Sequence, residues 1–459
     1  MYKIDFSHPC HVYFVGIGGI SMSGLAEILA DAGFQVSGSD RQKSALTEGL
    51  EQKGIRVFYG QRAGNITSDI DCVVCTSAIR EDNPEYIATM EQKLPHLTRA
   101  ELLGQLMKNY RTSIAISGTH GKTTTTSMIS EILLQADTDP TISVGGIYKS
   151  IGGNIRVGGS EYFVTEACEY TNSFLSFFPT VGVILNIEED HLDFFKDLND
   201  IRRSFRKFAE LLPREGCLVI NGDIADRQEI TDGLQCRVIT YSITDTHADY
   251  YASDISHDAF GHPAFTAHTL SGTRNVTLSV SGDHNIGNAL AALALADILH
   301  IDETTGVKAL KSFSGTDRRF EFKGSIAGVN IIDDYAHHPT EITATLKAAA
   351  NYPHKTLWCV FQPHTYTRTK AFLDDFAKAL CLADKVVLAD IYAARETDNL
   401  GISSRTLQEK IQALGGECYY FPTFDEIENF LLENCTKDDL LITMGAGDVH
   451  KIGENLLGI

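Results

Sequence analysis

A short stretch from Ser113 to Thr126 holds the residues whose types and spacing most clearly indicate chemistry. Its apolar start predicts a buried strand, Gly-Thr-His-Gly predicts a tight loop, and Lys122 and Thr123 begin a predicted helix. Loop amides, the positive helix end, a lysine and a hydroxyl that can hold Mg²⁺ together suit nucleotide phosphates. The full P-loop pattern has one more glycine, and Ile116 occupies that position. The alternative, an ordinary strand-loop-helix connection, gives no reason for a Lys-Thr pair at the helix start.

We therefore expect this loop to bind ATP and a divalent cation beside it. The candidate ATP-binding residues are Gly118, Thr119, His120, Gly121, Lys122, Thr123 and Thr124. Glu166 lies near the end of a predicted buried strand, where a Mg²⁺ ligand belongs next to a phosphate loop. His191 lies in an acidic turn and could be a ligand or an ordinary surface residue. The candidate metal ligands are Thr123, Glu166 and His191.

The first 40 residues predict a strand-helix-strand unit with a second glycine turn. The turn residues are Gly16, Gly18 and Gly19. Asp40 follows about 20 residues later, as in dinucleotide-binding turns. Ser21 stands where the third glycine of that pattern would fall, so the turn indicates a diphosphate more firmly than a nicotinamide cofactor. Thr76 and Ser77 end the next predicted strand and should open on the same crevice.

Two pairs of polar residues further along have both a chemical and a purely structural interpretation. Asn285 and Asn288 share one face of the first turn of a predicted helix, where they could meet a ligand or only cap the helix. Arg318 and Arg319 lie where the sequence changes to a pattern of strands that alternate with helices. They could be a solvated pair or supply an arginine to the γ-phosphate.

A chain of 459 residues is too long to form a single hydrophobic core, so more than one domain has to position these elements. Strands that alternate with helices predict an α/β protein with three such units. Within it, residues 247–280 predict a small antiparallel patch, and the glycine-rich residues 145–159 predict a mobile loop. Four predicted strands after residue 328 form the last unit.

Composition narrows the function classes. The net charge of −21 argues against a nucleic-acid scaffold held by phosphate contacts, so positive charge must be concentrated locally. Of the ten scattered cysteines, Cys72 and Cys75 form a C-x-x-C pair, but no second pair at zinc-like spacing follows. We interpret the pair as small buried hydrophobic residues in a reducing cytosol rather than as a metal or redox site. With no signal-like N-terminus and no long apolar run, we expect a cytoplasmic protein without membrane insertion.

Eight motifs in this order resemble the Mur ligase family over essentially the whole chain. They are Gly16 to Glu27, Gly118 to Thr124, Thr165 to Ala167, Asn186 to Asp193, Asp283 to Asn288, Arg318 to Glu321, Asp333 to Glu341 and Phe361 to His364. The first block and the Asp-Asp-Tyr-Ala-His-His-Pro-Thr-Glu block are typical of the branch that adds the first amino acid.

The resemblance implies three domains. They are a Rossmann-like UDP-sugar domain over residues 1–111, a P-loop ATPase domain over 112–317, and a Rossmann-like domain over 318–459 that closes over the site. The implied reaction uses ATP and Mg²⁺ to join L-alanine to the lactyl carboxylate of UDP-N-acetylmuramate through an acyl phosphate. A monomer or homodimer is expected, with no nucleic-acid partner.

Family roles then extend the candidate residues. The implied UDP-sugar-binding residues are Gly16, Gly18, Gly19, Ser39, Asp40, Thr76 and Ser77. Asn288, Arg319 and Asp334 would join the ATP site, and His364 and Arg368 would receive the amino acid. The implied catalytic residues are Lys122, His191, Asn285, Arg319 and His364, with His191 or His364 as the base that deprotonates the amine.

Three other functions remain open at this point. A recycling ligase would join a preformed peptide to the same sugar. A nicotinamide-dependent oxidoreductase would use the glycine turn that ends at Asp40, and a switch or motor ATPase would use the P-loop to move.

Overall fold

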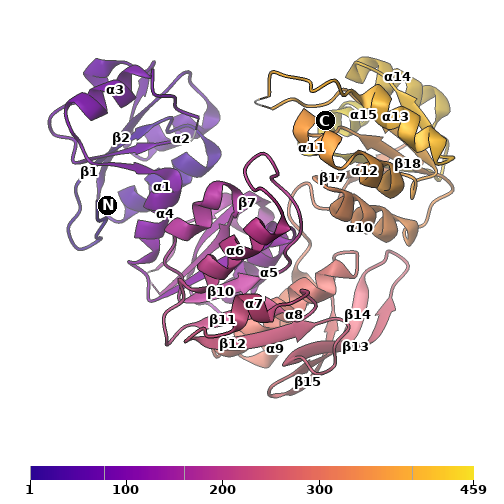
Figure 1. Cartoon of the computed structure of the whole chain (residues 1–459), viewed down its shortest axis with the longest axis horizontal. Helices are drawn as coiled ribbons and strands as arrows, with labels where there is room; N and C mark the ends of the chain where they lie inside the picture. The colour runs from indigo at the N-terminus through magenta and orange to yellow at the C-terminus, as the bar shows by residue number, and fades with distance from the viewer. Residues whose placement is uncertain (1, 77, 160, 395) are drawn as a thin grey trace.

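The computed structural model describes residues 2–76, 78–159, 161–394 and 396–459, and three sheets follow one another along the chain (Figure 1). The α/β class and the division into three units agree with the prediction. In Figure 1 the N-terminal unit is indigo, the central unit runs from purple to pink, and the C-terminal unit is orange to yellow.

The N-terminal unit is a five-stranded parallel sheet in the order β3-β2-β1-β4-β5. Its strands are β1 His11–Val15, β2 Gln35–Asp40, β3 Arg56–Tyr59, β4 Cys72–Cys75 and β5 His96–Thr98. Its helices are α1 Ile20–Asp31, α2 Ala45–Gln52, η1 Ala63–Asn65, α3 Pro84–Glu91 and α4 Arg99–Met107. The strand order reverses between β1 and β4, so the glycine turn after β1 lies at the point where open α/β sheets bind ligands.

The central unit is a ten-stranded mixed sheet with β6 Thr112–Ser117 near its middle, between β10 and β9. The other strands are β7 Thr141–Tyr148, β8 Gly153–Arg156, β9 Tyr162–Ala167, β10 Val181–Ile184, β11 Cys217–Asn221, β12 Arg237–Ser242, β13 Tyr250–His257, β14 Pro263–Thr269 and β15 Gly272–Thr277. Its helices are α5 Lys122–Gln135, η2 Lys149–Ile151, η3 Tyr170–Ser176, α6 Leu198–Ala209, α7 Gln228–Thr231, α8 His284–Ile298 and α9 Glu303–Ser312.

Two expectations for this unit have different outcomes. The antiparallel patch is confirmed by the pairings of β13 with β14 and of β14 with β15. The prediction of a mobile loop is wrong, because most of residues 145–159 belong to the antiparallel pair β7 and β8. Glycines in that pair permit close contacts with neighbouring side chains, so their number did not signal a loop.

The C-terminal unit is a six-stranded sheet in the order β16-β17-β21-β18-β19-β20. Its strands are β16 Glu321–Ile326, β17 Val329–Asp334, β18 Leu357–Phe361, β19 Lys385–Leu388, β20 Glu417–Tyr420 and β21 Leu440–Met444. Its helices are α10 Pro339–Ala350, α11 Tyr366–Ala371, α12 Leu373–Leu380, α13 Ser404–Ala413, α14 Phe424–Asn434 and α15 His450–Leu457. The four predicted strands are present, whereas the edge strands β16 and β20 were missed. Neither shows a buried apolar run, because no residue of β16 is fully buried and only Cys418 is buried in the four-residue β20.

The units are joined in two different ways. One continuous apolar cluster runs from the N-terminal sheet through α4 into the central unit, where Tyr110 packs on Phe163 with ring centroids 5.0 Å apart. The C-terminal unit has separate apolar clusters of its own. We infer that hydrophobic burial fixes the first two units together. The third unit is held mainly by polar contacts, together with the ring contact of Phe260 with Tyr352 at 5.4 Å. Within the described residues, no helix has the length and apolar character needed to cross a bilayer.

Alanine at Gly104 should destabilise the protein, because a Cβ there would overlap the carbonyl oxygen of Ser176 where α4 meets η3. We expect a loss of ~1–3 kcal/mol in urea-induced unfolding. Gly49→Ala in α2 is the matched control, since a Cβ there meets nothing within 4 Å. That change should stabilise the helix by ~0.5–1 kcal/mol. Equal stability of Gly104→Ala and the parent chain would contradict the packing of α4.

Candidate active site

The phosphate loop between β6 and α5 is held in shape by glycine conformations and by one asparagine. Gly118 and Gly121 have φ values of 143° and 83°, which side-chain-bearing residues rarely adopt. Asn186, just after β10, accepts from the amide of His120 at 2.7 Å and donates to its carbonyl at 3.1 Å. The loop is therefore pre-formed, and Asn186 was not among the predicted site residues.

Lys122, the predicted phosphate-binding lysine, is partly buried and contacts an acid that the prediction missed. Its Nζ donates to the carbonyl of Thr119 at 3.0 Å and pairs with Glu169 at 3.0 Å. Burial lowers the pKa of Lys122, but the Glu169 carboxylate more than compensates and raises it above its usual range. The lysine therefore stays cationic. Glu169 lies two residues beyond β9, at the carboxyl end of a strand, which is the signal that could have found it.

The predicted metal ligands lie around β7 and the end of β9. Glu166 accepts from the amide of Gly145 at 2.5 Å, and a Cβ on the next residue, Gly146, would lie 3.5 Å from the Thr123 methyl. Thr123 and Glu166 thus face adjacent residues of one strand. Hydroxyl and carboxylate oxygens suit Mg²⁺, so this donor set fits the ion.

His191, the third predicted ligand, lies in a left-handed backbone conformation with φ 54°. Its ring stacks on Tyr170 at 4.5 Å, and its Nε2 lies 3.9 Å from Glu169 Oε1 and 3.7 Å from Asp190 Oδ2. Burial lowers the pKa of His191, with the two carboxylates opposing that effect. A neutral imidazole is the form that binds metals or accepts a proton.

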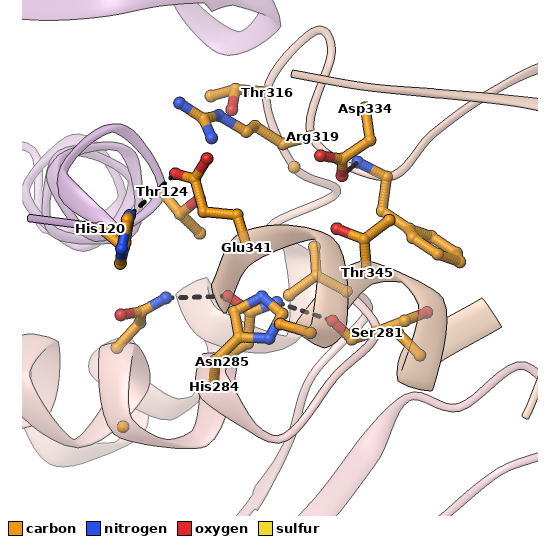
Figure 2. Close-up of a pocket in the computed structure, with 18 of the residues that line it drawn as sticks. His120, Thr124, Ser281, His284, Asn285, Thr316, Arg319, Asp334, Glu341 and Thr345 are labelled. Carbon is orange, nitrogen blue, oxygen red and sulfur yellow. Dashed lines mark hydrogen bonds and ion pairs between the residues drawn. The ribbon is translucent and has the colours of Figure 1, made fainter. Parts of the chain in front are cut away.

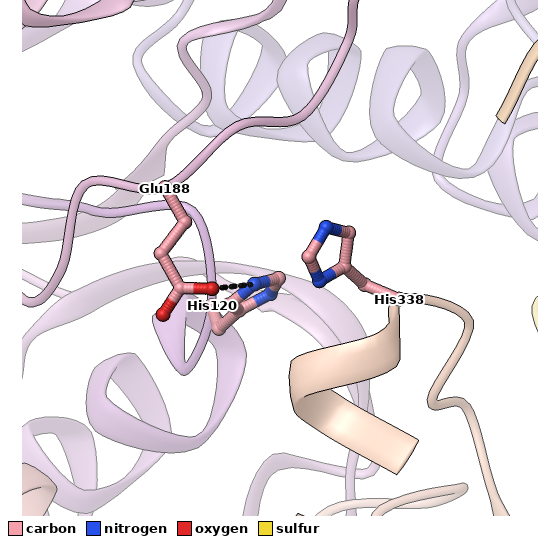
Figure 3. Close-up of side chains that lie close together, drawn as sticks. All are labelled: His120, Glu188 and His338. Carbon is pink, nitrogen blue, oxygen red and sulfur yellow. Dashed lines mark ion pairs between the residues drawn. The ribbon is translucent and has the colours of Figure 1, made fainter. Parts of the chain in front are cut away.

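His120, in the loop itself, lies between two carboxylates from different units. Its Nδ1 is 3.1 Å from Glu341 of α10, and its Nε2 is 3.4 Å from Glu188 of the central unit (Figures 2 and 3). Burial lowers the pKa of His120, but Glu341 and Glu188 raise it overall to about 9. The ring is therefore a buried imidazolium that connects the phosphate loop to the C-terminal unit.

His338 completes a group with His120 and Glu188 whose ligand atoms lie within 4.8 Å of one another (Figure 3). The group is a poor metal site. Nε2 of His338 donates to the Glu189 carbonyl at 3.0 Å, and its Nδ1 accepts from the Thr340 amide at 3.3 Å. With both nitrogens engaged and a cationic partner 4.7 Å away between ring centroids, His338 has no lone pair for a metal.

The segment Glu188–Asp190 carries three further contacts to the C-terminal unit. Thr340 Oγ1 donates to Glu188 at 2.6 Å, His338 donates to the Glu189 carbonyl, and Arg368 pairs with Asp190 at 2.8 Å. The next residue, His191, instead faces Glu169. A single loop therefore contacts both the C-terminal unit and the lysine site.

The predicted amino-acid-binding pair, His364 and Arg368, lies together beside this segment. Arg368 donates to His364 Nδ1 at 3.1 Å as well as to Asp190, so its guanidinium is already paired. Burial, together with the charges of His337 and Arg368, lowers the pKa of His364 to about 4. The ring of His364 also stacks on Tyr392. Whether these groups receive an amino acid stays a prediction.

A cavity of about 700 Å³ lies between the central and C-terminal units, next to the phosphate loop (Figure 2). Its lining combines polar groups with the rings of Tyr241, Phe260, Phe320 and Tyr352. Thr316 Oγ1 is buried and has no hydrogen-bond partner among the described residues, as expected for a group that meets a ligand. This mixture of polar and aromatic surface suits a nucleotide.

Seven of the predicted residues line this cavity: His120, Gly121, Thr124, Asn285, Asn288, Arg319 and Asp334. Asn288 donates to Asn285 at 3.0 Å and lies against Gly121, while Asn285 donates to the Ser281 carbonyl at 2.8 Å. Burial raises the pKa of Asp334 to about 6, and Arg319 opposes that rise. Their assigned ligand contacts remain predictions.

The two adjacent arginines have separate surroundings. Arg318 pairs with the buried Asp333 at 2.9 Å and donates to the carbonyls of Gly445 and Gly447. Arg319 lines the cavity and makes no ion pair with a described carboxylate. The solvated pair considered from sequence is therefore wrong for Arg318, and Arg319 is the one available to an anion.

The N-terminal glycine turn is built around Asp40. Gly18 donates its amide to Asp40 Oδ2 at 2.8 Å, and Gly16 has a φ of 82° with its Cα close to Thr76. Ser39 is fully buried and donates to Glu85, so it positions the strand rather than meeting solvent. The predicted Ser77 lies outside the described residues.

Comparison with known proteins decides the family. The chain matches the Mur ligase family catalytic domain over residues 11–111, the Mur ligase middle domain over 116–296, and the Mur ligase glutamate ligase domain over 318–447. It is 60% identical to the UDP-N-acetylmuramate–L-alanine ligase of Agathobacter rectalis, with 100% of both chains covered. The chain belongs to the Mur ligase family.

Solved structures of Mur ligases agree with this assignment. The crystal structure of the UDP-N-acetylmuramate–alanine ligase of Thermotoga maritima matches with a TM-score of 0.80 and 29% identity, covering 98% of each chain. A murein peptide ligase from Psychrobacter arcticus matches with a TM-score of 0.72 and 25% identity over 98% of each chain.

Substitution of the two arginines should separate chemistry from stability. Arg319→Gln should lower ATP-dependent turnover by about 10³-fold or more with little change in Tm, because its guanidinium faces the cavity. Arg318→Gln should lower the stability by ~3–5 kcal/mol, since it leaves the buried Asp333 unpaired. Turnover assays and thermal unfolding check both, and a reversed pattern would exchange the two roles.

The stability contribution of His120 should depend on pH. Its pKa is raised from 6.5 to about 9 in the folded chain, so its stabilisation is complete below pH 6.5 and is lost as the pH rises through about 9. His120→Gln should therefore lower Tm at pH 6, at a cost on the order of 2–3 kcal/mol, and much less at pH 10. Thermal unfolding of both chains from pH 6 to 10 measures this. A pH-independent difference would show that His120 is not cationic.

Proposed function

We propose that this chain is an ATP-dependent ligase that joins L-alanine to the lactyl carboxylate of UDP-N-acetylmuramate and releases ADP and phosphate. The observation that carries the proposal is the full-length identity of 60% to a UDP-N-acetylmuramate–L-alanine ligase. A second such relative, from Clostridium botulinum, is 50% identical over 98% of both chains. The cavity next to the phosphate loop is lined by Arg319, and Lys122 of the same loop is paired with Glu169; both are consistent with this reaction.

The division of labour follows the three units. We assign UDP-sugar binding to residues 1–111, ATP binding to 112–317, and closure with amino acid binding to 318–459. Residues 2–76 carry the glycine turn and Asp40 on one crevice, which supports the first assignment. We expect the enzyme to work in the cytoplasm, where ATP and sugar nucleotides are available.

The chemistry requires that a carboxylate be converted into an acylating agent. Transfer of the γ-phosphoryl group of ATP to the lactyl carboxylate forms a carboxyl–phosphate bond and releases ADP. Attack by the neutral amine of L-alanine then forms the amide, and phosphate leaves with the bonding electron pair. Lys122 and Arg319, both cationic, would neutralise the charge of the transferring phosphoryl group.

Thr123 and Glu166 would hold Mg²⁺ near this centre, because hydroxyl and carboxylate oxygens are the ligands that the ion prefers. His191, the third predicted ligand, offers a nitrogen instead and is assigned below as the base. The ion would add Lewis-acid stabilisation of phosphate charge when bound. Glu169 would keep Lys122 oriented until the phosphates arrive. The cross-unit contacts at Glu188–Asp190 would keep water from the acyl phosphate once the third unit is docked.

The base that takes the amine proton is better supplied by His191 than by His364. The Nδ1 lone pair of His364 accepts from Arg368, so its free nitrogen carries a proton and donates. His191 has carboxylates on both sides that stabilise its cationic form. This assignment remains a proposal.

The recycling ligase is the rival within the family. Two solved peptide ligases are 25% and 30% identical over 98% and 68% of this chain, whereas the L-alanine ligase of Agathobacter rectalis is 60% identical over the whole chain. The oxidoreductase and motor readings have no support among the relatives, which are ligases over their whole length.

Phosphate release from ATP should require both UDP-N-acetylmuramate and L-alanine. Lys122→Ala should lower the rate by about 10³-fold or more, because it removes the charge that stabilises phosphoryl transfer. Binding of the UDP-sugar should persist in this variant. Lys43→Ala, an exposed residue paired with Glu48 in the N-terminal unit, is the control and should keep full activity.

Three results would contradict the proposal. Equal phosphate release without either acceptor would leave an ATPase, and release that needs a preformed peptide instead of L-alanine would favour the recycling ligase. Reduction of a nicotinamide cofactor by a hydroxy substrate would favour the oxidoreductase.

A further inference from the structure

Arg99, the first residue of α4, is a cation with no assigned role in the predicted site. Its guanidinium donates to Ser21 Oγ at 3.1 Å. Burial lowers the pKa of Arg99, which shows that the charged form has lost much of its hydration. In the part of the chain that the structure describes, no carboxylate lies within ion-pair distance of it.

This arrangement differs from that of other shielded arginines. Arg274, Arg318 and Arg368 each contact a carboxylate, at 2.7, 2.9 and 2.8 Å. The chain has 60 acidic and 39 basic residues, so an acidic partner would have been easy to supply. A cation at the first position of a helix also opposes the helix dipole. Arg99 therefore costs stability in the free protein, which points to an anion that it binds.

The neighbours of Arg99 show where that anion would lie. Ser21 is the second residue of α1, directly after the glycine turn Gly16–Gly19. Cys168, just beyond β9, is close enough to both Arg99 and Lys122 to affect the pKa of each. Arg99 thus lies beside the start of α1 and near the part of the central unit that carries Lys122.

The two units meet closely at this point. A Cβ on Gly24 of α1 would overlap Ile155 of β8, and Asn154 donates to the carbonyl of Ile20 at 3.5 Å. The start of α1 therefore faces the central unit, and the joint apolar cluster keeps that spacing constant. A ligand that runs from the glycine turn to Lys122 has to pass Arg99.

We propose that Arg99, together with the hydroxyl of Ser21, binds the diphosphate of the sugar nucleotide at the seam between the N-terminal and central units. This inference rests on the proposed function. The planar guanidinium can donate two parallel hydrogen bonds to phosphate oxygens, which fixes orientation as well as charge. Held there, the diphosphate would direct the sugar and its carboxylate towards Lys122. The anion replaces the missing carboxylate partner.

The test compares the full-length parent with Arg99→Gln by calorimetric titration with UDP and with uridine. We expect UDP binding to weaken at least about tenfold, as for loss of a charged hydrogen bond, with uridine binding unchanged. Arg111→Gln is the matched control, because Arg111 is exposed and pairs with the exposed Glu161. The control should bind UDP as the parent does. Arg99→Lys should recover part of the affinity, since a lysine keeps the charge without the fork.

Thermal unfolding without ligand distinguishes this role from a structural one. Removal of an unpaired cation should leave the Tm unchanged or raise it, whereas a structural arginine would lower it. Unaltered UDP affinity in Arg99→Gln would overturn the proposal. So would weakening confined to UDP-N-acetylmuramate, which would assign Arg99 to the lactyl carboxylate, or equal loss of uridine binding with a lower Tm.

The parent chain separates this result from failure of the proposed function. If the parent protein ligates L-alanine and binds UDP, and Arg99→Gln binds UDP equally well, only the role of Arg99 is refuted. If the parent protein neither binds UDP nor releases phosphate in the presence of UDP-N-acetylmuramate and L-alanine, the proposed function itself is refuted.

Discussion

The short loop after β10 is the constraint on which the rest of the site depends. Asn186 holds the backbone of the phosphate loop, Glu188–Asp190 bind the C-terminal unit, and His191 faces Glu169. Because these residues are consecutive, docking of the third unit cannot change without moving groups beside Lys122. Covalent connection thus links the position of the C-terminal unit to the phosphate site.

The interface between the first two units differs in kind from the interface with the third unit. Apolar packing between the first two units is costly to break in water, so they behave as one body that keeps the glycine turn at a constant distance from Lys122. The third unit is held by imidazole, hydroxyl and guanidinium contacts. Polar contacts can be exchanged for water at modest cost, which is consistent with the proposed closure of this unit over the site.

The cationic side chains of the site differ in whether a carboxylate lies beside them, although the protein as a whole is strongly acidic. Lys122 is paired with Glu169 and His120 with two carboxylates, so these cations are stabilised before any phosphate arrives. Arg319 lacks a described carboxylate partner and lines the cavity. The contrast explains how a chain with net charge −21 can attract anionic nucleotides. The positive potential is therefore strongest at Arg319, and it is partly neutralised by carboxylates at Lys122 and His120.

The sequence by itself determined the local chemistry and the class of fold. The Gly-Thr-His-Gly-Lys-Thr loop, the alternation of strands and helices, and the antiparallel patch depend on spacing within short segments, and backbone geometry translates such spacing directly into structure. The tertiary structure decided which charges meet. Glu341 lies 221 residues from His120 in the chain, and Arg368 lies 178 residues from Asp190. No periodicity records such pairings, because they arise from how whole units dock.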